Sequence, residues 1–419
     1  MSQKQLKPTL TGQRIRTRKR DEKEKYEPLT FRDSIIAGLN ASGDLEKASK
    51  YLDGAASSLD YHRYAEVLFD VLIAGGMLAP GGGIVLECSE GQPHKTTMCL
   101  FDAEDSLEAV KEHVQLLNSL MRRYKYLQKN FEDEMNKVLQ FLKGFTDEQR
   151  HKLALYTGLV ISGGIAPASA LCKLLSEHLV KPGLALTFMT NVLKTWLGEK
   201  DMTSVGGALK KAGLNSKLLE FLPGRQSFEA FEKHFTENKL PVVIGFQKSQ
   251  QAALVRRELQ SHIKEMLENE IPVEEMVADA KGQMQILALA EPDVIVLIWK
   301  VIMSSVEWNK KEEFVAEQAL KHLKVYAPLF AAFSTQSRSE LTLIVRIQEY
   351  CYENMNFMKV FQKIIMLLYK TDVLSEDCIL KWYKDDHSPK GKSVFLAQMK
   401  KMVEWLQSAE EESSSGDEQ

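Results

Sequence analysis

The feature that most limits the fold of this chain is a helical spacing of apolar side chains along most of its length. Between Glu104 and Gly144, apolar residues recur every three or four positions, at Leu107, Val110, Val114, Leu117, Leu120, Met121, Tyr124, Leu127, Phe131, Met135, Val138 and Leu142. This spacing gives a helix one apolar face. Similar runs follow, separated by short breaks that contain Gly, Pro, Asn or Ser, and few segments alternate with a period of two. The sequence therefore predicts an all-α fold.

The length of the chain and its breaks predict two helical domains. At ~100–200 residues per domain, 419 residues are too many for one helical bundle. The repeated hairpin lengths fit degenerate repeats of the HEAT type. The segment TENKLPVVIGFQKSQ (236–250) interrupts the rhythm, and a helix is expected to restart at Gln250. We expect a disordered basic segment at 1–27, helical domains at 28–240 and 248–409, and a disordered acidic tail at 410–419. Helices of the second domain are expected near 272–288, 291–308, 310–332, 338–355, 357–371, 375–387 and 391–409.

Charge is distributed unevenly along the chain. The net charge is −3, which argues against a globally basic nucleic-acid binder. Residues 1–25 nevertheless carry nine basic and three acidic side chains, whereas six acidic and no basic side chains follow Lys401. The part up to residue 247 has 33 basic and 30 acidic residues, and the remainder has 21 and 27. This asymmetry predicts a basic partner for the C-terminal part, although charged termini also serve as solubilising tails.

Catalytic and metal-binding motifs are missing from the sequence. The five Cys form no CxxC pair, and none of the nine His lies in an HExxH motif. Gly391-Lys392-Ser393 resembles the end of a phosphate-binding loop, but Asp386 occupies the position of the required glycine. No secretory leader is read at the N-terminus, and the longest apolar run, 294–303, is about half a membrane span. We therefore expect a cytoplasmic protein without catalytic activity, cofactor, metal ion or membrane contact.

Three leucines at heptad spacing follow the basic N-terminal cluster. Leu45, Leu52 and Leu59 together with that cluster suggest a basic leucine zipper, which needs one unbroken helix through both parts. Pro28 and several later glycines, among them Gly43, interrupt such a helix. We therefore expect these leucines to face the core of short helices.

Two segments near the C-terminus mix aromatic and acidic residues, namely 367–386 and 402–413. On helices, the two Trp rings and Leu406 are expected to pack inward while the carboxylates project outward. Such an acidic surface attracts lysine-rich segments and steers their encounter. The candidate partner-binding residues are Asp372, Glu376, Asp377, Trp382, Tyr383, Asp385, Asp386, Glu404, Trp405, Glu410, Glu411 and Glu412.

These two segments carry a family resemblance. ILKWY (379–383) followed by VEWLQSAEEES (403–413) resembles the paired aromatic–acidic boxes of the W-two domain, the C-terminal HEAT-like domain of translation initiation factor 5 and of the epsilon subunit of initiation factor 2B. Over nearly its full length, the chain resembles the basic leucine zipper and W-two domain-containing proteins, also called initiation factor 5 mimic proteins. The segments that carry this wider resemblance are TGQRIRTRKRDEKEKYEP, RRYKYLQKNFEDEM, EWNKKEEFVAEQALKHLK, VLSEDCILKWYK and GKSVFLAQMKKMVEWLQSAEEES.

The resemblance implies both a fold and a function. It implies an N-terminal HEAT-type domain similar to the middle domain of initiation factor 4 gamma, and a W-two domain at 248–409. It further implies a non-catalytic regulator that competes with initiation factor 5 for lysine-rich segments of the initiation factor 2 beta subunit and for the preinitiation complex. Contact with initiation factor 3, restrained initiation and stricter start-codon choice are implied as well. Initiation factor 5 also has a GTPase-activating domain with a four-Cys zinc ribbon, and this sequence has no such cysteine spacing.

Two other functions remain open at this point. A helical scaffold would bind other proteins through its HEAT surfaces and would need neither acidic segment. A direct RNA-binding protein would use the basic cluster Arg14–Arg20 and basic residues such as Arg122, Arg123 and Lys125. RNA binding would be recognised by its strong dependence on salt.

Overall fold

The computed structural model describes residues 26–87, 93–309, 311–385 and 387–414. Helices account for the regular structure of these residues, which include no β-strand and only an isolated antiparallel bridge between Leu78 and Ile84. The prediction of an all-α fold is confirmed. The chain divides into two compact units, Met1–Lys248 (unit 1) and Ser249–Gln419 (unit 2). The basic segment 1–25 and Asp386 lie outside the described residues.

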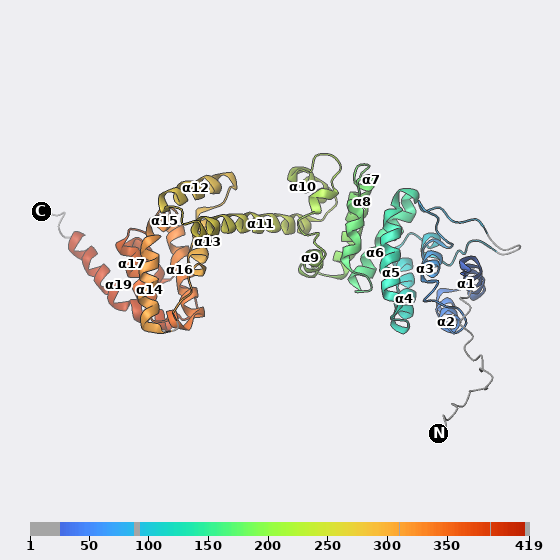
Figure 1. Cartoon of the computed structure of the whole chain (residues 1–419), viewed down its shortest axis with the longest axis horizontal. Helices are drawn as coiled ribbons and strands as arrows, with labels where there is room; N and C mark the ends of the chain where they lie inside the picture. The colour runs from blue at the N-terminus through green and yellow to red at the C-terminus, as the bar shows by residue number, and fades with distance from the viewer. Residues whose placement is uncertain (1–25, 88–92, 310, 386, 415–419) are drawn as a thin grey trace, which may run out of the picture. The chain divides into compact units, whose positions relative to one another are not determined.

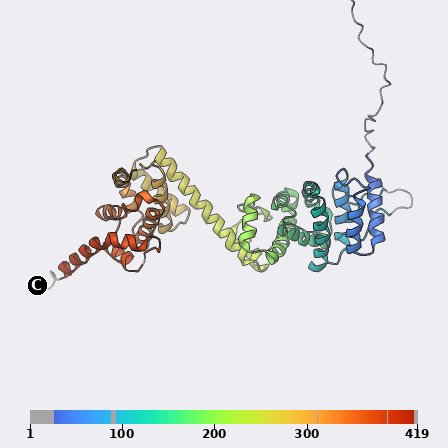
Figure 2. The same ribbon diagram turned by 90° about the horizontal axis from the view of Figure 1, so that it is seen from below.

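Unit 1 is a stack of helices in two layers. One layer contains α2, α4, α6 and α8, and the other contains α1, α3, α5 and a 3₁₀ segment (Ala168–Leu175), so each helix packs on the helix two places along the chain. Figures 1 and 2 show α1 to α8 following one another side by side in chain order. This arrangement is typical of helical-repeat proteins. The helices are α1 (Pro28–Ser42), α2 (Leu45–Ala55), α3 (Ala65–Ala74), α4 (Leu107–Arg123), α5 (Leu127–Gln140), α6 (Asp147–Ser162), α7 (Glu177–Val180), α8 (Leu184–Glu199), α9 (Met202–Lys211) and α10 (Phe228–Glu237).

The heptad leucines belong to the core of unit 1. Gly43 ends α1 in the left-handed conformation, and the Asp44 carboxylate caps α2 by accepting the Lys47 N–H. Leu52 is buried in α2, while Leu45 and Leu59 pack against the same core. The expectation that these residues face the core of short helices is confirmed, and the described part of the chain has no continuous helix through them.

One long helix, α11 (Pro241–Glu268), contributes to both units. Its first turn buries Val243 and Ile244 in the core of unit 1, and a later part buries Leu259 and Ile263 in the core of unit 2. The break in the helical rhythm lies at 238–240, where Lys239 has a φ of 60°, and the helix begins at Pro241 rather than at Gln250. Proline is well suited to a first helical position because its missing N–H has no helical partner there.

Unit 2 repeats the two-layer arrangement. Helices α13, α16 and α18 pack in one layer, and α14, α17 and α19 pack in the other. The expected helix 310–332 is two helices, because the Pro328 nitrogen cannot donate a helical hydrogen bond. The last helix continues to Ser414, beyond the expected end at 409. The helices are α12 (Val273–Ile286), α13 (Glu291–Ser304), α14 (Glu312–Val325), α15 (Ala327–Ala331), α16 (Ser337–Glu353), α17 (Phe361–Lys370), α18 (Glu376–Lys384) and α19 (Lys392–Ser414).

Candidate functional site

Helix α18 carries the first aromatic–acidic segment, and a buried glutamine on α16 holds its C-terminal end. Gln348 is fully buried, and its amide oxygen accepts hydrogen bonds from Trp382 Nε1 and from the Ser388 N–H, both at 3.0 Å. Its amide nitrogen donates to the Ser388 and Lys390 carbonyls, both at 2.8 Å. The side chain therefore uses its full capacity of two donors and two acceptor positions. It ties α16 to Trp382 and to the loop that follows α18.

A buried carboxylate on the same helix holds the other end of α18. Glu340 Oε2 accepts the Ser375 N–H at 2.6 Å and the Ser375 hydroxyl at 2.7 Å. Ser375 in turn caps α18 by accepting the Cys378 N–H. Glu340 and Gln348 are eight residues apart, which is about 12 Å along a helix and close to the length of α18. One helix thus fixes both ends of the segment.

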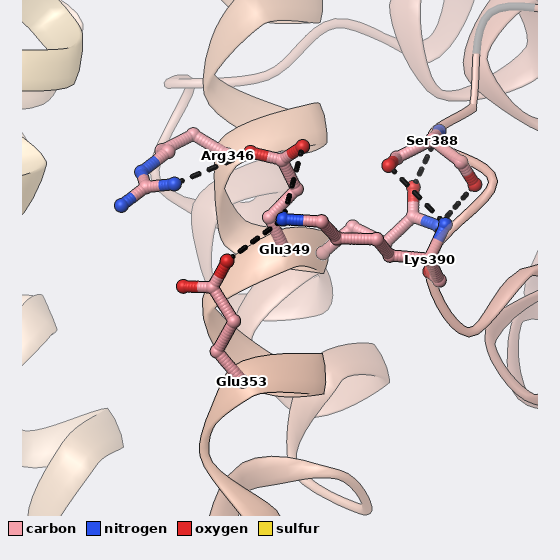
Figure 3. A network of polar contacts seen from close by, with 6 residues as sticks. Arg346, Glu349, Glu353, Ser388 and Lys390 are labelled. Carbon is pink, nitrogen blue, oxygen red and sulfur yellow. Dashed lines mark hydrogen bonds and ion pairs between the residues drawn. The ribbon is translucent and has the colours of Figure 1, made fainter.

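Exposed ion pairs surround the loop after α18 (Figure 3). The Lys390 ammonium lies 2.8 Å from Glu353 and 3.9 Å from Glu349, and Arg346 donates to Glu349 at 3.2 Å. The hydrogen bond from Lys390 lowers the pKa of Glu353 and raises the pKa of Lys390. These groups are exposed to water, so their pairs contribute little to stability.

Replacing Gln348 with Leu is expected to lower the free energy of unfolding of unit 2 by about 2–3 kcal/mol. The change leaves two buried donors, Trp382 Nε1–H and the Ser388 N–H, without partners, and each such group costs ~1–3 kcal/mol. Chemical denaturation of the full chain measures the effect. Lys390→Ala is the matched control in the same network, with an expected change within about 0.5 kcal/mol because its pairs are exposed. Equal stability of Q348L and wild type would contradict the assigned role of the glutamine.

The predicted carboxylates on α18 lie at its two ends. Asp372 is exposed in the turn before α18, and Glu376 and Asp377 form the first turn of the helix. Asp385 is exposed at the C-terminal cap. Between these ends, the exposed side of the helix carries Lys381 and Lys384, while the Tyr383 ring packs partly against the core. The carboxylates therefore form two separate groups rather than one row.

The two tryptophans differ in their environment. Trp382 is 1% exposed and packs on Phe361 with ring centres 5.2 Å apart, so its prediction as a core residue is confirmed. Trp405 is 53% exposed and meets only the edge of Tyr369 at 6.2 Å among the ring contacts of the described residues. The expectation that its ring packs inward is wrong, because Leu406, which is fully buried, occupies the inward position of α19. A large aromatic ring that stays in water is a candidate contact residue.

The second acidic segment lies on the last turns of α19. Glu404 is exposed next to Trp405, with Lys400 3.9 Å away. Glu410, Glu411 and Glu412 continue the helical backbone, and their side chains lie outside what the structure describes. Figures 1 and 2 show this end of α19 projecting from the rest of unit 2. The structure thus brings Trp405 and Glu404 together with Tyr369, whose helix ends two residues before Asp372.

Sequence reasoning missed the two anchors on α16. Glu340 and Gln348 occupy the same helical stripe as the buried Leu343, Ile344 and Ile347. Polar side chains at positions where the period requires apolar ones were the available signal, because a buried polar group needs a hydrogen-bond partner.

A buried cluster of charged groups lies in unit 1, between α3 and α5. The Lys137 ammonium lies 2.7 Å from Asp70, 2.9 Å from Glu134 and 3.0 Å from Glu66. Asp70 also accepts the Leu78 N–H at 3.0 Å. Burial together with the neighbouring Asp70 raises the pKa of Glu134 to about 9, so this carboxyl holds a proton at neutral pH. The cluster is structural in its contacts, since all its partners belong to unit 1.

The described residues give no support for metal or membrane chemistry. Within the described ranges, no three or more His, Cys, Asp or Glu side chains are grouped so that they could hold a metal ion. Of the helices that the structure describes, none combines the length and the apolar character needed to cross a bilayer.

Comparison with known proteins assigns both parts of the chain. A family model described as the 5MP1/2 HEAT domain matches residues 15–257, and the W2 model described as eIF4-gamma/eIF5/eIF2-epsilon matches residues 339–416, which include most of α16 and all of α17 to α19. The chain is 54% identical to eIF5-mimic protein 1 of Gallus gallus, covering 98% of this chain and 99% of that protein. It is 51% identical to eIF5-mimic protein 2 of Gallus gallus and 53% identical to eIF5-mimic protein 1 of Danio rerio, with coverage of at least 98% on both sides. The chain belongs to the eIF5-mimic protein family.

Proposed function

We propose that this protein is a cytoplasmic, non-catalytic regulator of translation initiation that competes with initiation factor 5 for lysine-rich segments of the initiation factor 2 beta subunit. Its membership of the eIF5-mimic family and its eIF5-like W2 match support a role in translation initiation. The observation that carries the finer proposal is the exposed Trp405 ring beside Glu404 and the carboxylates around α18. Contact with initiation factor 3 and the preinitiation complex, restrained initiation and stricter start-codon choice belong to the same proposal.

The proposed contact divides the work between ring and carboxylates. The carboxylates attract a cationic segment over several ångströms and speed its encounter with the surface. The Trp405 ring then offers apolar area to the methylene groups of lysine side chains and a ring face to their ammonium groups. Buried Trp382 has no direct contact in this proposal and acts by keeping α18 in place.

Neutralising the described carboxylates is expected to weaken binding of a lysine-rich peptide about tenfold at low salt. The variant carries Asp372→Asn, Asp377→Asn, Asp385→Asn and Glu404→Gln, four positions at the surface where charge adds little to stability. The loss should shrink at high salt because ions screen exposed charges. Fluorescence anisotropy with a labelled peptide from the lysine-rich segment of the beta subunit, at two salt concentrations, measures the effect.

The matched control neutralises four exposed carboxylates elsewhere around unit 2, on α11 and α12. These are Glu258, Glu265, Glu274 and Glu275, each replaced by Gln. The control changes the net charge equally, so it should retain near wild-type affinity if position matters. Equal weakening by both sets would reduce the proposal to a non-specific charge effect. Unchanged binding by the α18 and α19 set at low salt would exclude the proposed surface.

A further inference from the structure

A group of tyrosines and an arginine gathers around the turn 61–64 in unit 1. The rings of Tyr26 and Tyr64 stack with their centres 5.1 Å apart, and the Arg63 guanidinium lies 5.7 Å and 5.6 Å from those centres. Tyr64 stacks in turn on buried Phe31 at 4.9 Å, and its hydroxyl oxygen accepts the Glu27 N–H at 3.1 Å. These contacts fix the rings, yet Tyr26 remains 55% exposed.

The same turn supports a second exposed ring. His62 contacts Tyr126 at 5.8 Å, and Tyr126 is 47% exposed. Tyr124 links this ring to the core: it contacts Tyr126 at 6.0 Å and buried Tyr61 at 5.8 Å, and its hydroxyl donates to the Asp53 carbonyl at 2.9 Å. Two exposed tyrosines therefore lie one ring contact away from the turn. We call Tyr26, His62, Arg63, Tyr64 and Tyr126 the tyrosine platform.

Basic side chains surround the tyrosine platform. Arg122, Lys125 and Lys129, next to Tyr124 and Tyr126 in the chain, are exposed and have no ion-pair partner among the described residues. The segment 1–25, with nine basic and three acidic residues, joins the platform directly at Tyr26.

Two carboxylates reduce this positive charge locally. Glu27 and Asp60 line a hollow of about 420 Å³ beside Tyr64. The attraction of an anionic ligand therefore depends on the surrounding basic residues and the N-terminal segment, and the rings supply the short-range contacts. A polyanion held by charge alone would have no use for two anchored, exposed tyrosines.

We propose that the tyrosine platform binds single-stranded RNA. Exposed rings beside basic side chains are the combination that binds unpaired nucleic acid, because every base has a face that stacks on an aromatic ring while the phosphates meet the cations. Bases in a duplex are stacked on one another and cannot reach the rings. An acidic peptide would satisfy the charges but has few flat groups for the tyrosines. The choice of RNA over single-stranded DNA rests on the proposed function in translation.

The test is fluorescence anisotropy of the full chain with a labelled, unstructured RNA of about 12 nucleotides, a length within the usual range of such sites. Tyr26→Ala and Tyr126→Ala are each expected to weaken binding about 5- to 10-fold, as expected for loss of one stacked base. Tyr26→Phe and Tyr126→Phe retain the ring and should bind like wild type. Tyr352→Ala, a 45% exposed tyrosine of unit 2, is the matched control and should have no effect.

A second measurement isolates the charge contribution. Replacing Arg122, Lys125 and Lys129 with Gln should reduce the slope of log affinity against log salt by about 0.7 for each phosphate that these side chains no longer neutralise. Removing residues 1–25 should reduce the slope further. No initiation factor is present in these assays, so their outcome is independent of the acidic surface of unit 2.

Four outcomes would overturn the proposal. These are no detectable RNA binding at low salt, alanine variants that bind like wild type, duplex RNA bound as tightly as the single strand, or an acidic peptide bound more tightly than RNA. Equal binding of single-stranded DNA would retain the platform and remove the preference for RNA. Because the two substituted rings are half exposed, the alanine variants should melt like wild type, and the phenylalanine variants show whether a loss of affinity follows the ring.

Discussion

Replacing Trp382 with Ala is expected to lower the free energy of unfolding of unit 2 by about 3–5 kcal/mol, the usual cost of removing a buried tryptophan from a core. The ring is 1% exposed and packs on Phe361, so its removal leaves a cavity. The substitution also removes the indole N–H that occupies one acceptor position of buried Gln348. At ~2–4 °C per kcal/mol for a unit of this size, the melting temperature should fall by roughly 10 °C.

Trp405→Ala is the matched control for this prediction. With 53% of its surface exposed, Trp405 should contribute within about 1 kcal/mol to stability, yet its loss should weaken binding of the lysine-rich peptide. Calorimetry and circular dichroism of the full chain measure melting, and peptide anisotropy measures binding. Similar melting of the two variants would contradict the assignment of one ring to the core and the other to the surface.

Replacing Lys137 with Met is expected to destabilise unit 1 by about 3–5 kcal/mol near pH 8, because it leaves a buried carboxylate without its counter-charge. Asp70 and Glu134 are both buried and lie within 3 Å of the Lys137 ammonium. At acidic pH both carboxyls can take up protons, so the cost of the substitution should fall. Denaturation of the full chain with urea between about pH 5 and pH 9 measures this dependence.

The wild-type protein should also lose stability as pH rises through this range. Glu134 in the folded protein keeps its proton up to a pKa of about 9, whereas the unfolded chain releases it near the ordinary glutamate pKa of 4.5. The folded state therefore binds more protons in this window, and the free energy of unfolding falls by up to about 1.4 kcal/mol per pH unit. The raised pKa of Asp70 acts in the same direction, and the raised pKa of Lys137 has no effect below about pH 10.

Glu134→Gln separates titration from packing in this cluster. The amide has the shape of the protonated carboxyl and cannot ionise, so the variant should match wild type near pH 5 and show a flatter decline toward pH 9. A decline as steep as that of wild type would assign the pH dependence to other groups.

The helices of this protein follow from the spacing of its apolar residues, which is why the two-layer units could be expected. Helix α17 and the start of α18 lie within a few residues of their predicted positions, because core residues such as Ile364 and Ile379 recur with the helical period. The place where one unit ends was harder to predict. Segment 241–250 contains no residue that stops a helix after Pro241, and the two cores divide within α11 rather than at a loop.

The site was predicted in its residue types and only partly in its arrangement. Trp405 could have been assigned to the surface from the sequence: Met399, Met402 and Leu406 define the buried stripe of α19, and each helical residue turns by about 100°, which places Trp405 to one side of it. The buried Glu134 shows the opposite case. Charged residues on helices are usually solvated, and only the three-dimensional meeting of α3 and α5 identifies this one as part of the core.

The attachment of α18 at both ends has a consequence for how such proteins diversify. Glu340 and Gln348 position the helix from its buried side, so the outward residues Asp377, Lys381 and Lys384 are not needed to keep it in place. Mutations at those positions can accumulate without loss of folding, and each one changes the charge pattern offered to a partner. A gene duplicate can therefore acquire a new preference through a few substitutions on one helix, while the older copy keeps the original one.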